Sequence, residues 1–455
     1  MMRGANRTGG NRMTVPRDHS DALTEISALF DPEADAAPPP ARTRRWRGPV
    51  VVLTMFALLA GAVGGYVVWA LSAPLPAATL FASAPEPPTT EPVTLAMPTR
   101  AAAAVVITGF DESVQVGGTM SAAVGGSEPR PIASIAKLVT ALTILDAYPI
   151  APNEAGPTIT FGKAAHDLYD DYYVRGATIV PMPTGITMSL RDALSVMLIP
   201  SASNYADALA TWAFGSTSGY LGTARGWLSE QGLDDTVIVD PTGISPANTA
   251  TPEDLLALAR IASANPVVAE IAATTSFDVR GIDRVQSTNA LLGVDGVTGL
   301  KTGNLGMEQF NLLFTARIDA PGGQRLDVVG VILGGSTRAS VDGNVRTLLA
   351  SIRDGFRQIA LTEPRQRVGT VETVWGKSSA VVVAGSPAVR VWSDAPIDVE
   401  LRATAPVHQT AGTGVGELVW TTPSGAQSAR VVLAEDIPEP SAWWRLTHPG
   451  DLADW

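Results

Sequence analysis

One uncharged apolar run near the N-terminus restricts the fold of this chain more than any other feature. No charged residue occurs from Pro49 to Leu71, and the run is about long enough to cross a bilayer of ~30 Å as a helix. Basic residues crowd the preceding segment and are then absent until Arg100, so we expect a cytoplasmic N-terminus. The preceding cations are Arg42, Arg44, Arg45 and Arg47. A cleaved signal peptide is the alternative, but the long polar extension and the length of the run disfavour it.

The segments on either side of this run lack the pattern of a folded domain. Residues 1–48 are polar and rich in Arg, Asp and Pro, which predicts a disordered cytoplasmic tail. Residues 72–100 contain seven prolines and predict a semi-extended linker. With a transmembrane helix over 49–71, the rest of the chain is expected outside the cytoplasm.

Residues 101–362 alternate between strand and helix patterns and predict one α+β domain. A strand is expected near Val105, and the apolar strands 310–318 and 326–333 are joined through APGGQ, which predicts an antiparallel hairpin. Helices are expected over 134–146, 189–197, 205–214, 251–264 and 344–356. Thr251 followed by Pro252 is a typical helix start.

The C-terminal part of the chain has a different character. Short Val-rich runs separated by Gly, Pro, Ser and Asp fill residues 363–436 and predict a small β domain. The last segment, 437–455, contains Trp443, Trp444 and Trp455 and is expected to pack against that domain, with contact to lipid as the alternative.

Composition removes several classes of function. The formal net charge is −12 and the pI about 4.9, so no nucleic-acid partner is expected. Without cysteine there are no disulfides, thiol nucleophiles or Cys-bound zinc. Only four histidines occur and no Gly-x-Ser-x-Gly elbow is present, which weighs against a His-ligated metal and a Ser-His-Asp hydrolase. Lysine is equally rare, at four of 32 basic residues, although it alone can supply a deprotonated amine where arginine stays charged.

The first candidate motif is Ser134-Ile135-Ala136-Lys137, at the start of an expected helix. Positions three apart share one helix face, so the amine of Lys137 can reach the hydroxyl of Ser134. A serine becomes a good nucleophile when a neighbouring base removes its proton, and burial or the positive end of a helix dipole makes lysine such a base. Helix capping by Ser134 with a solvated Lys137 is the alternative.

The second candidate motif is the loop Ser201-Ala202-Ser203-Asn204, between two expected helices. Its hydroxyl and amide groups suit a proton relay or a contact with a peptide carbonyl. Helix capping is again the alternative, especially for Ser203 and Asn204.

The third candidate motif is Lys301-Thr302-Gly303, shortly before the hairpin. A lysine on a strand, with a hydroxyl beside it, suits a substrate carboxylate, and glycine lets a peptide backbone approach closely. Two of the four lysines thus fall in motifs whose order along the chain is that of penicillin-binding proteins and β-lactamases.

Together with these motifs, DPTGISPAN, TPEDLLALA and STNALL make residues 101–356 resemble the serine D-alanyl-D-alanine carboxypeptidases, the low-molecular-weight penicillin-binding proteins. The resemblance implies a β-lactamase/transpeptidase-like α+β domain with an antiparallel sheet flanked by helices, a helical subdomain, and an active site between them. It implies peptidoglycan stem peptides ending in D-Ala-D-Ala as substrate, β-lactams as acylating inhibitors, and no cofactor or metal.

The resemblance also implies a role for each motif residue. Ser134 would form the acyl-enzyme and Lys137 would be its base, while Ser201 would bridge Lys137 to the leaving amine. Lys301 and Thr302 would bind the terminal carboxylate, with Gly303 and Asn304 on the same edge, and backbone N–H groups of Ser134 and Asn304 would form the oxyanion hole.

Two departures from the family pattern stand out. The loop usually reads Ser-x-Asn, but Ser203 occupies the Asn position here, with Asn204 one step later. The anchor is N-terminal, whereas many relatives use a C-terminal amphipathic helix.

Several activities remain open at this stage. A transpeptidase or endopeptidase would use the same residues, and a non-catalytic wall sensor would keep the cleft without turnover. A class A β-lactamase is disfavoured, because no Glu-x-x-Leu-Asn segment occurs between Asn204 and Lys301.

Overall fold

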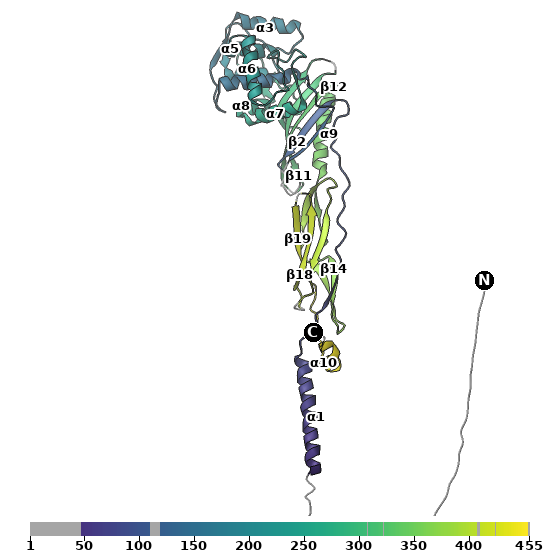
Figure 1. Ribbon diagram of the computed structural model, residues 1–455. Helices are drawn as coiled ribbons and strands as arrows, with labels where there is room; N and C mark the ends of the chain where they lie inside the picture. The colour runs from purple at the N-terminus through teal and green to yellow at the C-terminus, as the bar shows by residue number, and fades with distance from the viewer. Residues whose placement is uncertain are drawn as a thin grey trace, which may run out of the picture. The chain divides into compact units, whose positions relative to one another are not determined.

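The computed structural model describes residues 47–109, 119–306, 308–321, 323–406, 410–423 and 425–453. The chain divides into two units, Met1–Ser72 and Ala73–Trp455. The described part of the first unit is helix α1 (Arg47–Ser72), which encloses the apolar run (Figure 1). Its stretch Gly48–Ser72 is long and apolar enough to cross a membrane, and its most apolar window is not buried.

An antiparallel five-stranded sheet forms the centre of the region 101–362, with the strand order β10-β11-β12-β2-β3. The strands are β2 (Ala102–Thr108), β3 (Thr119–Val124), β10 (Val297–Asn304), β11 (Phe310–Ala320) and β12 (Gln324–Gly335). The expected hairpin is confirmed, because β11 pairs with β12 in antiparallel register. Strand β10, which carries the Lys-Thr-Gly motif, lies at one edge.

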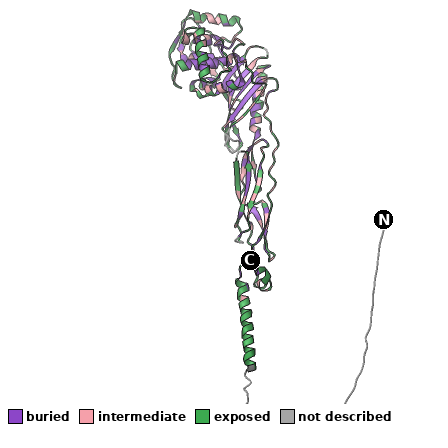
Figure 2. Cartoon of the chain, viewed as in Figure 1, coloured by how far each residue is buried: buried purple, intermediate pink, exposed green. Residues whose placement is uncertain are grey.

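The two faces of this sheet pack against different helices, as the alternation of side chains along a strand requires. On β2, Val105 faces a core shared with α9 (Arg338–Gly355), whereas Val106 faces the core of the helical region. That region contains α2 (Ala136–Ala147), α3 (Lys163–Val174), α4 (Leu190–Leu198), α5 (Ser203–Phe214), α6 (Thr217–Glu230), α7 (Pro252–Ala264) and α8 (Pro266–Ala272). Figure 2 shows buried residues concentrated in these layers. The α+β class with an antiparallel sheet flanked by helices is confirmed.

Helix boundaries follow local capping chemistry. Thr251 caps α7 by accepting a hydrogen bond from the N–H of Asp254, which confirms the predicted start. The expected helix 344–356 was placed too late, because α9 begins at Arg338. Thr337 and Ser340 form a reciprocal capping box there, and this satisfies the first free N–H groups.

The C-terminal β region is an antiparallel six-stranded sheet in the order β1-β14-β15-β19-β18-β17. Its strands are β1 (Thr79–Ala82), β14 (Arg367–Glu372), β15 (Ser378–Val383), β17 (Asp398–Ala403), β18 (Gly414–Thr422) and β19 (Gly425–Leu433). A separate pair joins β13 (Phe356–Ala360) to β16 (Ala388–Trp392). Alternate valines and the fully buried Trp420 form the core of this region.

The proline-rich segment 72–100, expected as a semi-extended linker, is bonded to the folded regions along its length. Its residues 79–82 form β1, which pairs with β14. Farther along, Oγ1 of Thr90 donates to the carbonyl of Ser393 at 2.6 Å, and the N–H of Ala96 donates to Oγ of Ser351 at 2.9 Å. The segment is therefore bonded to both the β region and α9.

The C-terminal tail packs as expected where it is described. Trp444 on α10 (Ala442–Thr447) lies edge-on to Trp375 with ring centroids 6.0 Å apart, and Arg445 donates to the carbonyl of Ala73 at 2.8 Å. Trp443 stays 74% exposed, and Trp455 lies outside the described residues.

Candidate active site

Ser134 lies in the tight turn that leads into α2. This turn is the 3-10 helix η1 (Ala133–Ile135), and Ala133 holds φ at +53°, a left-handed conformation that is unusual for alanine. Such backbone strain persists only where the surroundings enforce it, and it is typical of functional sites. The turn presents the Ser134 side chain to the pocket.

Two glycines leave room for this turn. A Cβ on Gly243 would lie 1.9 Å from the carbonyl oxygen of Ala133, and Gly243 itself has φ +78°. A Cβ on Gly303 would lie 2.7 Å from the carbonyl oxygen of Ile132. Gly303, expected to admit a substrate backbone, lines the pocket and also makes space for the turn that carries Ser134.

Lys137, the second residue of α2 and one helical turn after Ser134, is fully buried. Its Nζ lies 2.9 Å from Oγ of Ser134, 2.6 Å from the carbonyl oxygen of Thr242 and 3.3 Å from Oγ of Ser203. Burial lowers the pKa of Lys137 from 10.5 to about 7, although the negative charge of Asp240 opposes this shift. A substantial fraction of the side chain is therefore a neutral amine near neutral pH, as a general base requires.

The loop that supplies the Thr242 carbonyl is organised around Asp240. Its carboxylate accepts hydrogen bonds from the N–H groups of Thr242, Gly243 and Ser245, the hydroxyl of Thr242 and the amide of Asn248. Burial raises the pKa of Asp240, but these hydrogen bonds outweigh it and leave the pKa below its usual value. A further hydrogen bond joins this loop to α2: the hydroxyl of Thr140 donates to the carbonyl of Pro241 at 2.8 Å.

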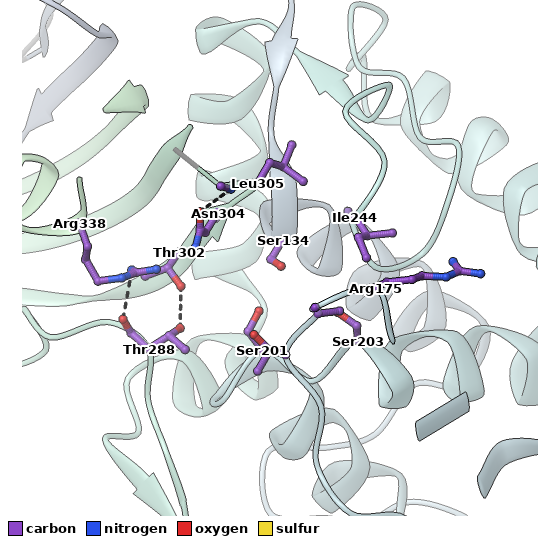
Figure 3. A pocket seen from close by; sticks show the side chains of 16 residues that line it. Ser134, Arg175, Ser201, Ser203, Ile244, Thr288, Thr302, Asn304, Leu305 and Arg338 are labelled. Atoms are coloured by element: carbon purple, nitrogen blue, oxygen red, sulfur yellow. Dashed lines mark hydrogen bonds between the residues drawn. The ribbon is translucent and has the colours of Figure 1, made fainter. Parts of the chain in front are cut away.

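Of the two serines in this loop, Ser203 forms the hydrogen bond with Lys137. Ser203, the first residue of α5, bonds to Lys137, whereas Ser201 was expected to be the bridge. Ser201 adopts φ +70° in the loop before the helix and lines the pocket beside Ser134 (Figure 3). The reason is geometric, because the start of α5 directs Ser203, not Ser201, toward Lys137.

The side chain of Asn204, expected at the substrate, lies outside the pocket lining and is bonded to the protein itself. It is fully buried, and its side-chain amide bonds to both the N–H and the carbonyl of Val180, at 3.2 and 2.8 Å. The N–H of Ser203 donates to the carbonyl of Thr178, and the hydroxyl of Tyr205 to that of Pro181. The start of α5 therefore holds segment 178–181 against the serine loop.

The Lys-Thr-Gly motif lies on β10, facing the turn that carries Ser134. Lys301 is 2% exposed, and its Nζ donates to the carbonyl of Thr302 at 3.1 Å. Burial lowers the pKa of Lys301 well below 10.5, and the charges of Lys137 and Arg338 lower it further. The hydroxyls of Thr302 and Thr288 lie 2.6 Å apart.

One pocket of about 490 Å³ joins the three motifs (Figure 3). Its lining comprises Ser134, Arg175, Gly176, Ala177, Thr178, Ser201, Ser203, Gly243, Ile244, Thr288, Thr302, Gly303, Asn304, Leu305, Gly306 and Arg338. Of the residues expected at the site, Lys137 and Lys301 lie beneath this surface, and Asn204 lies outside it.

Two arginines in this lining were not predicted from the sequence. Arg338, at the start of α9, donates to the carbonyl of Thr288 at 3.3 Å, and Arg175 follows the C-terminal end of α3. Neither belongs to a recognisable motif, so only the fold brings them to the pocket. Among the residues that the structure describes, no group of three His, Asp or Glu side chains could hold a metal ion.

Comparison with known proteins agrees with this arrangement. A family model described as D-alanyl-D-alanine carboxypeptidase, Peptidase_S11, matches residues 101–337. A D-alanyl-D-alanine carboxypeptidase DacD from Salmonella typhimurium is 24% identical over 266 residues, which are 57% of this chain and 65% of that protein. A D-alanyl-D-alanine endopeptidase from Escherichia coli is 26% identical over 145 residues, 32% of this chain and 44% of the relative. The chain thus spans less than two thirds of the length of either curated relative.

Solved structures of similar architecture include penicillin binding protein 5 from Haemophilus influenzae, with TM-score 0.48 and 18% identity over 75% of this chain and 99% of that one. A Streptomyces DD-transpeptidase gives TM-score 0.47 and 24% identity over 56% of this chain and 98% of that one. The family model covers more than half of the sequence and contains all three motifs. This chain belongs to the D-alanyl-D-alanine carboxypeptidase family of serine peptidases.

Proposed function

We propose that this protein is a membrane-anchored serine carboxypeptidase that removes the terminal D-alanine from peptidoglycan stem peptides ending in D-Ala-D-Ala. The observation that carries the proposal is the buried, partly neutral amine of Lys137 at 2.9 Å from the Ser134 hydroxyl. This pair provides a nucleophile together with its base, and the pocket around it has the polar lining that a peptide requires.

In the acylation step, the proton of the Ser134 hydroxyl moves to Nζ of Lys137 as Oγ attacks the carbonyl carbon of the penultimate D-alanine. The N–H groups of Ser134 and Asn304, whose residues share the pocket, are proposed to bind the resulting oxyanion. The intermediate collapses as the C–N bond breaks, and the leaving amine takes the proton from Lys137. Ser203, which bonds to Lys137, is the better candidate than Ser201 to pass this proton.

The terminal carboxylate of the substrate is proposed to lie beside Thr302 and Arg338. Both residues line the pocket, and the guanidinium of Arg338 is held near Thr302 by its bond to Thr288. Buried Lys301 supports this end of the pocket from below, and an arriving carboxylate would favour its charged form. Water then attacks the ester carbonyl while Lys137 again takes a proton. The bond from this carbon to Oγ of Ser134 breaks, Oγ regains its proton from Lys137, and the shortened peptide leaves with a new carboxylate.

The proposal also includes the cellular location of the protein, anchored in the membrane with its catalytic domain outside the cytoplasm. Helix α1 has the length and composition of a membrane span, and the arginines before it favour a cytoplasmic N-terminus with the catalytic domain outside. We divide the chain into a tail (1–48), a membrane helix (49–71), a linker (72–100), a catalytic domain (101–362), a β domain (363–436) and a tail (437–455). β-Lactams are proposed to acylate Ser134.

Endopeptidase activity is the second candidate, because the E. coli relative carries that name. The chemistry at Ser134 would be unchanged, and only the leaving group would differ. A transpeptidase would replace water by an amine acceptor.

The test measures D-alanine released from a synthetic peptide ending in D-Ala-D-Ala by the detergent-solubilised full chain. Mass spectrometry of the penicillin-treated protein would locate the adduct, which we expect on Ser134. An adduct without D-alanine release would instead support a non-catalytic wall sensor, and an adduct elsewhere would refute the assigned nucleophile.

A further inference from the structure

We propose that Arg175 makes the enzyme prefer stem peptides whose acyl-donor part carries a side-chain carboxylate. This inference rests on the proposed carboxypeptidase function and adds a specificity residue to it. Arg175 lines the same pocket as Ser134 but lies on the other side of it from Arg338, and its guanidinium points away from the nucleophile (Figure 3). It is therefore placed to contact a remote group of the substrate, not the reacting bond.

The charge of the pocket is opposite to that of the protein. The chain carries a formal net charge of −12, yet the pocket lining contains two arginines and no aspartate or glutamate. One cation beside Thr302, Arg338, is enough to bind the terminal carboxylate of the substrate. A second cation at the far side therefore indicates a second anionic group on the substrate.

The backbone of Arg175 is held in place by the same contacts that build the serine loop. Helix α3 ends there with Gly176 at φ +65°, and the N–H groups of Gly176 and Ala177 donate to the carbonyls of Tyr173 and Tyr172. Three residues farther on, the carbonyl of Thr178 accepts the N–H of Ser203 at 2.8 Å. The position of Arg175 is thus fixed relative to the catalytic loop.

One face of the Arg175 guanidinium contacts an aromatic ring, and its N–H donors remain available to a ligand. Its guanidinium carbon lies 5.2 Å from the ring centroid of Tyr172, a buried residue whose hydroxyl donates to Asp207 at 2.9 Å. Stacking on an aromatic face leaves the planar N–H donors available at the edge, where they fit a carboxylate. No ion pair involving Arg175 is found among the described residues.

The experiment compares two acetylated peptides that differ only in the residue before D-Ala-D-Ala, which is either 2-aminopimelate or its side-chain amide. D-Alanine release by the solubilised full chain gives kcat and KM for each. We expect kcat/KM to be about threefold to tenfold higher for the carboxylate peptide, mostly through KM, as one partly exposed charge-assisted contact would produce. Raising the salt concentration should reduce the preference.

Three variants complete the test. Arg175→Gln should remove the preference by raising KM for the carboxylate peptide alone, and Arg175→Lys should retain part of it. Arg225→Gln, an exposed change on α6 outside the pocket, should leave the preference intact. Two results would overturn the inference and leave the proposed carboxypeptidase function intact. One is equal kcat/KM for both peptides in the unmodified enzyme, and the other is a preference that survives Arg175→Gln. Release from neither peptide would overturn the carboxypeptidase and the inference together.

Discussion

Nζ of Lys137 lies 2.6 Å from the carbonyl oxygen of Thr242, closer than its 2.9 Å to Oγ of Ser134. A neutral lysine amine has two N–H donors and one lone pair. The carbonyl of Thr242 can only accept, and the hydroxyl of Ser203 at 3.3 Å can take the second N–H. The lone pair is then left for the proton of Ser134, so the surroundings of the amine orient it as a base.

The rate of acylation should depend on pH through Lys137. Because burial lowers its pKa to about 7, the base is protonated and inactive below that pH and becomes neutral above it. We expect the rate of labelling by a fluorescent penicillin to rise about tenfold per pH unit below pH 6 and to level off above pH 8. A rate that stays flat from pH 5 to 9 would contradict a lysine base with this pKa.

Replacing the base should abolish acylation without removing the nucleophile. Lys137→Arg keeps a cation that cannot accept the proton, and Lys137→Met keeps the apolar stem. We expect both variants to label with penicillin at least ~100-fold more slowly, in the range of general-base contributions. Ser134→Ala provides the matched control with no adduct. Near-normal labelling of Lys137→Arg would refute the assigned role.

The two loop serines should differ in their effects. Ser203→Ala removes a partner of the Lys137 amine and is expected to slow acylation about tenfold, the cost of roughly one hydrogen bond in the transition state. Ser203→Asn, which restores the usual family residue, should recover much of the rate. Ser201→Ala should slow acylation less than Ser203→Ala; the reverse order, measured as kcat/KM on the peptide, would return the bridging role to Ser201.

Stability should depend on the carboxylate of Asp240. Asp240→Ala leaves its donors without their acceptor, and we expect a loss of ~2 kcal/mol and a fall in Tm of about 4–8 °C. The pKa of Asp240 is lower in the folded protein than in the unfolded chain. Its stabilisation is therefore complete above the unfolded value and disappears as pH falls through the folded value. The Tm difference between variant and parent should be constant above the ordinary aspartate pKa of about 3.9 and should shrink as the pH falls below it.

Gly243→Ala tests whether the close approach of two chain segments positions the nucleophile. The new Cβ would overlap the carbonyl of Ala133, so the Ser134 turn has to move. Gly232→Ala is the matched control, because Gly232 also has positive φ, at +70°, but open space around it. Gly232→Ala should lose ~1 kcal/mol through backbone strain alone, and Gly243→Ala should lose more, because the overlap adds to the strain. Only Gly243→Ala should also lose penicillin labelling, and equal labelling of the two would argue against this packing.

Local features were predictable from the sequence because neighbouring residues determine them. Thr251 and Pro252 start a helix by their own chemistry, and the spacing of Ser134 and Lys137 fixes their contact once a helix forms. The choice of Ser203 over Ser201 depends on how α5 faces α2, which spacing does not encode.

Features that depend on residues far apart in the chain could not be predicted from the sequence. Strand β1 is flanked by prolines, and only its pairing with β14 makes it a strand. The side chain of Asn204 turns to Val180, and Arg175 and Arg338 reach one pocket from helices far apart in the chain. Each of these depends on tertiary contacts, which outweigh local composition.

The early start of β1 also limits the length of free chain between this strand and α1. Only residues 73–78 separate the end of α1 from the first strand, and six residues extend to at most ~20 Å. If α1 spans a bilayer, as proposed, the chain therefore keeps the first residue of β1 within that distance of the end of α1. The reach of the proposed carboxypeptidase from the lipid then depends on its folded regions, because the rest of the proline-rich segment is bonded to them.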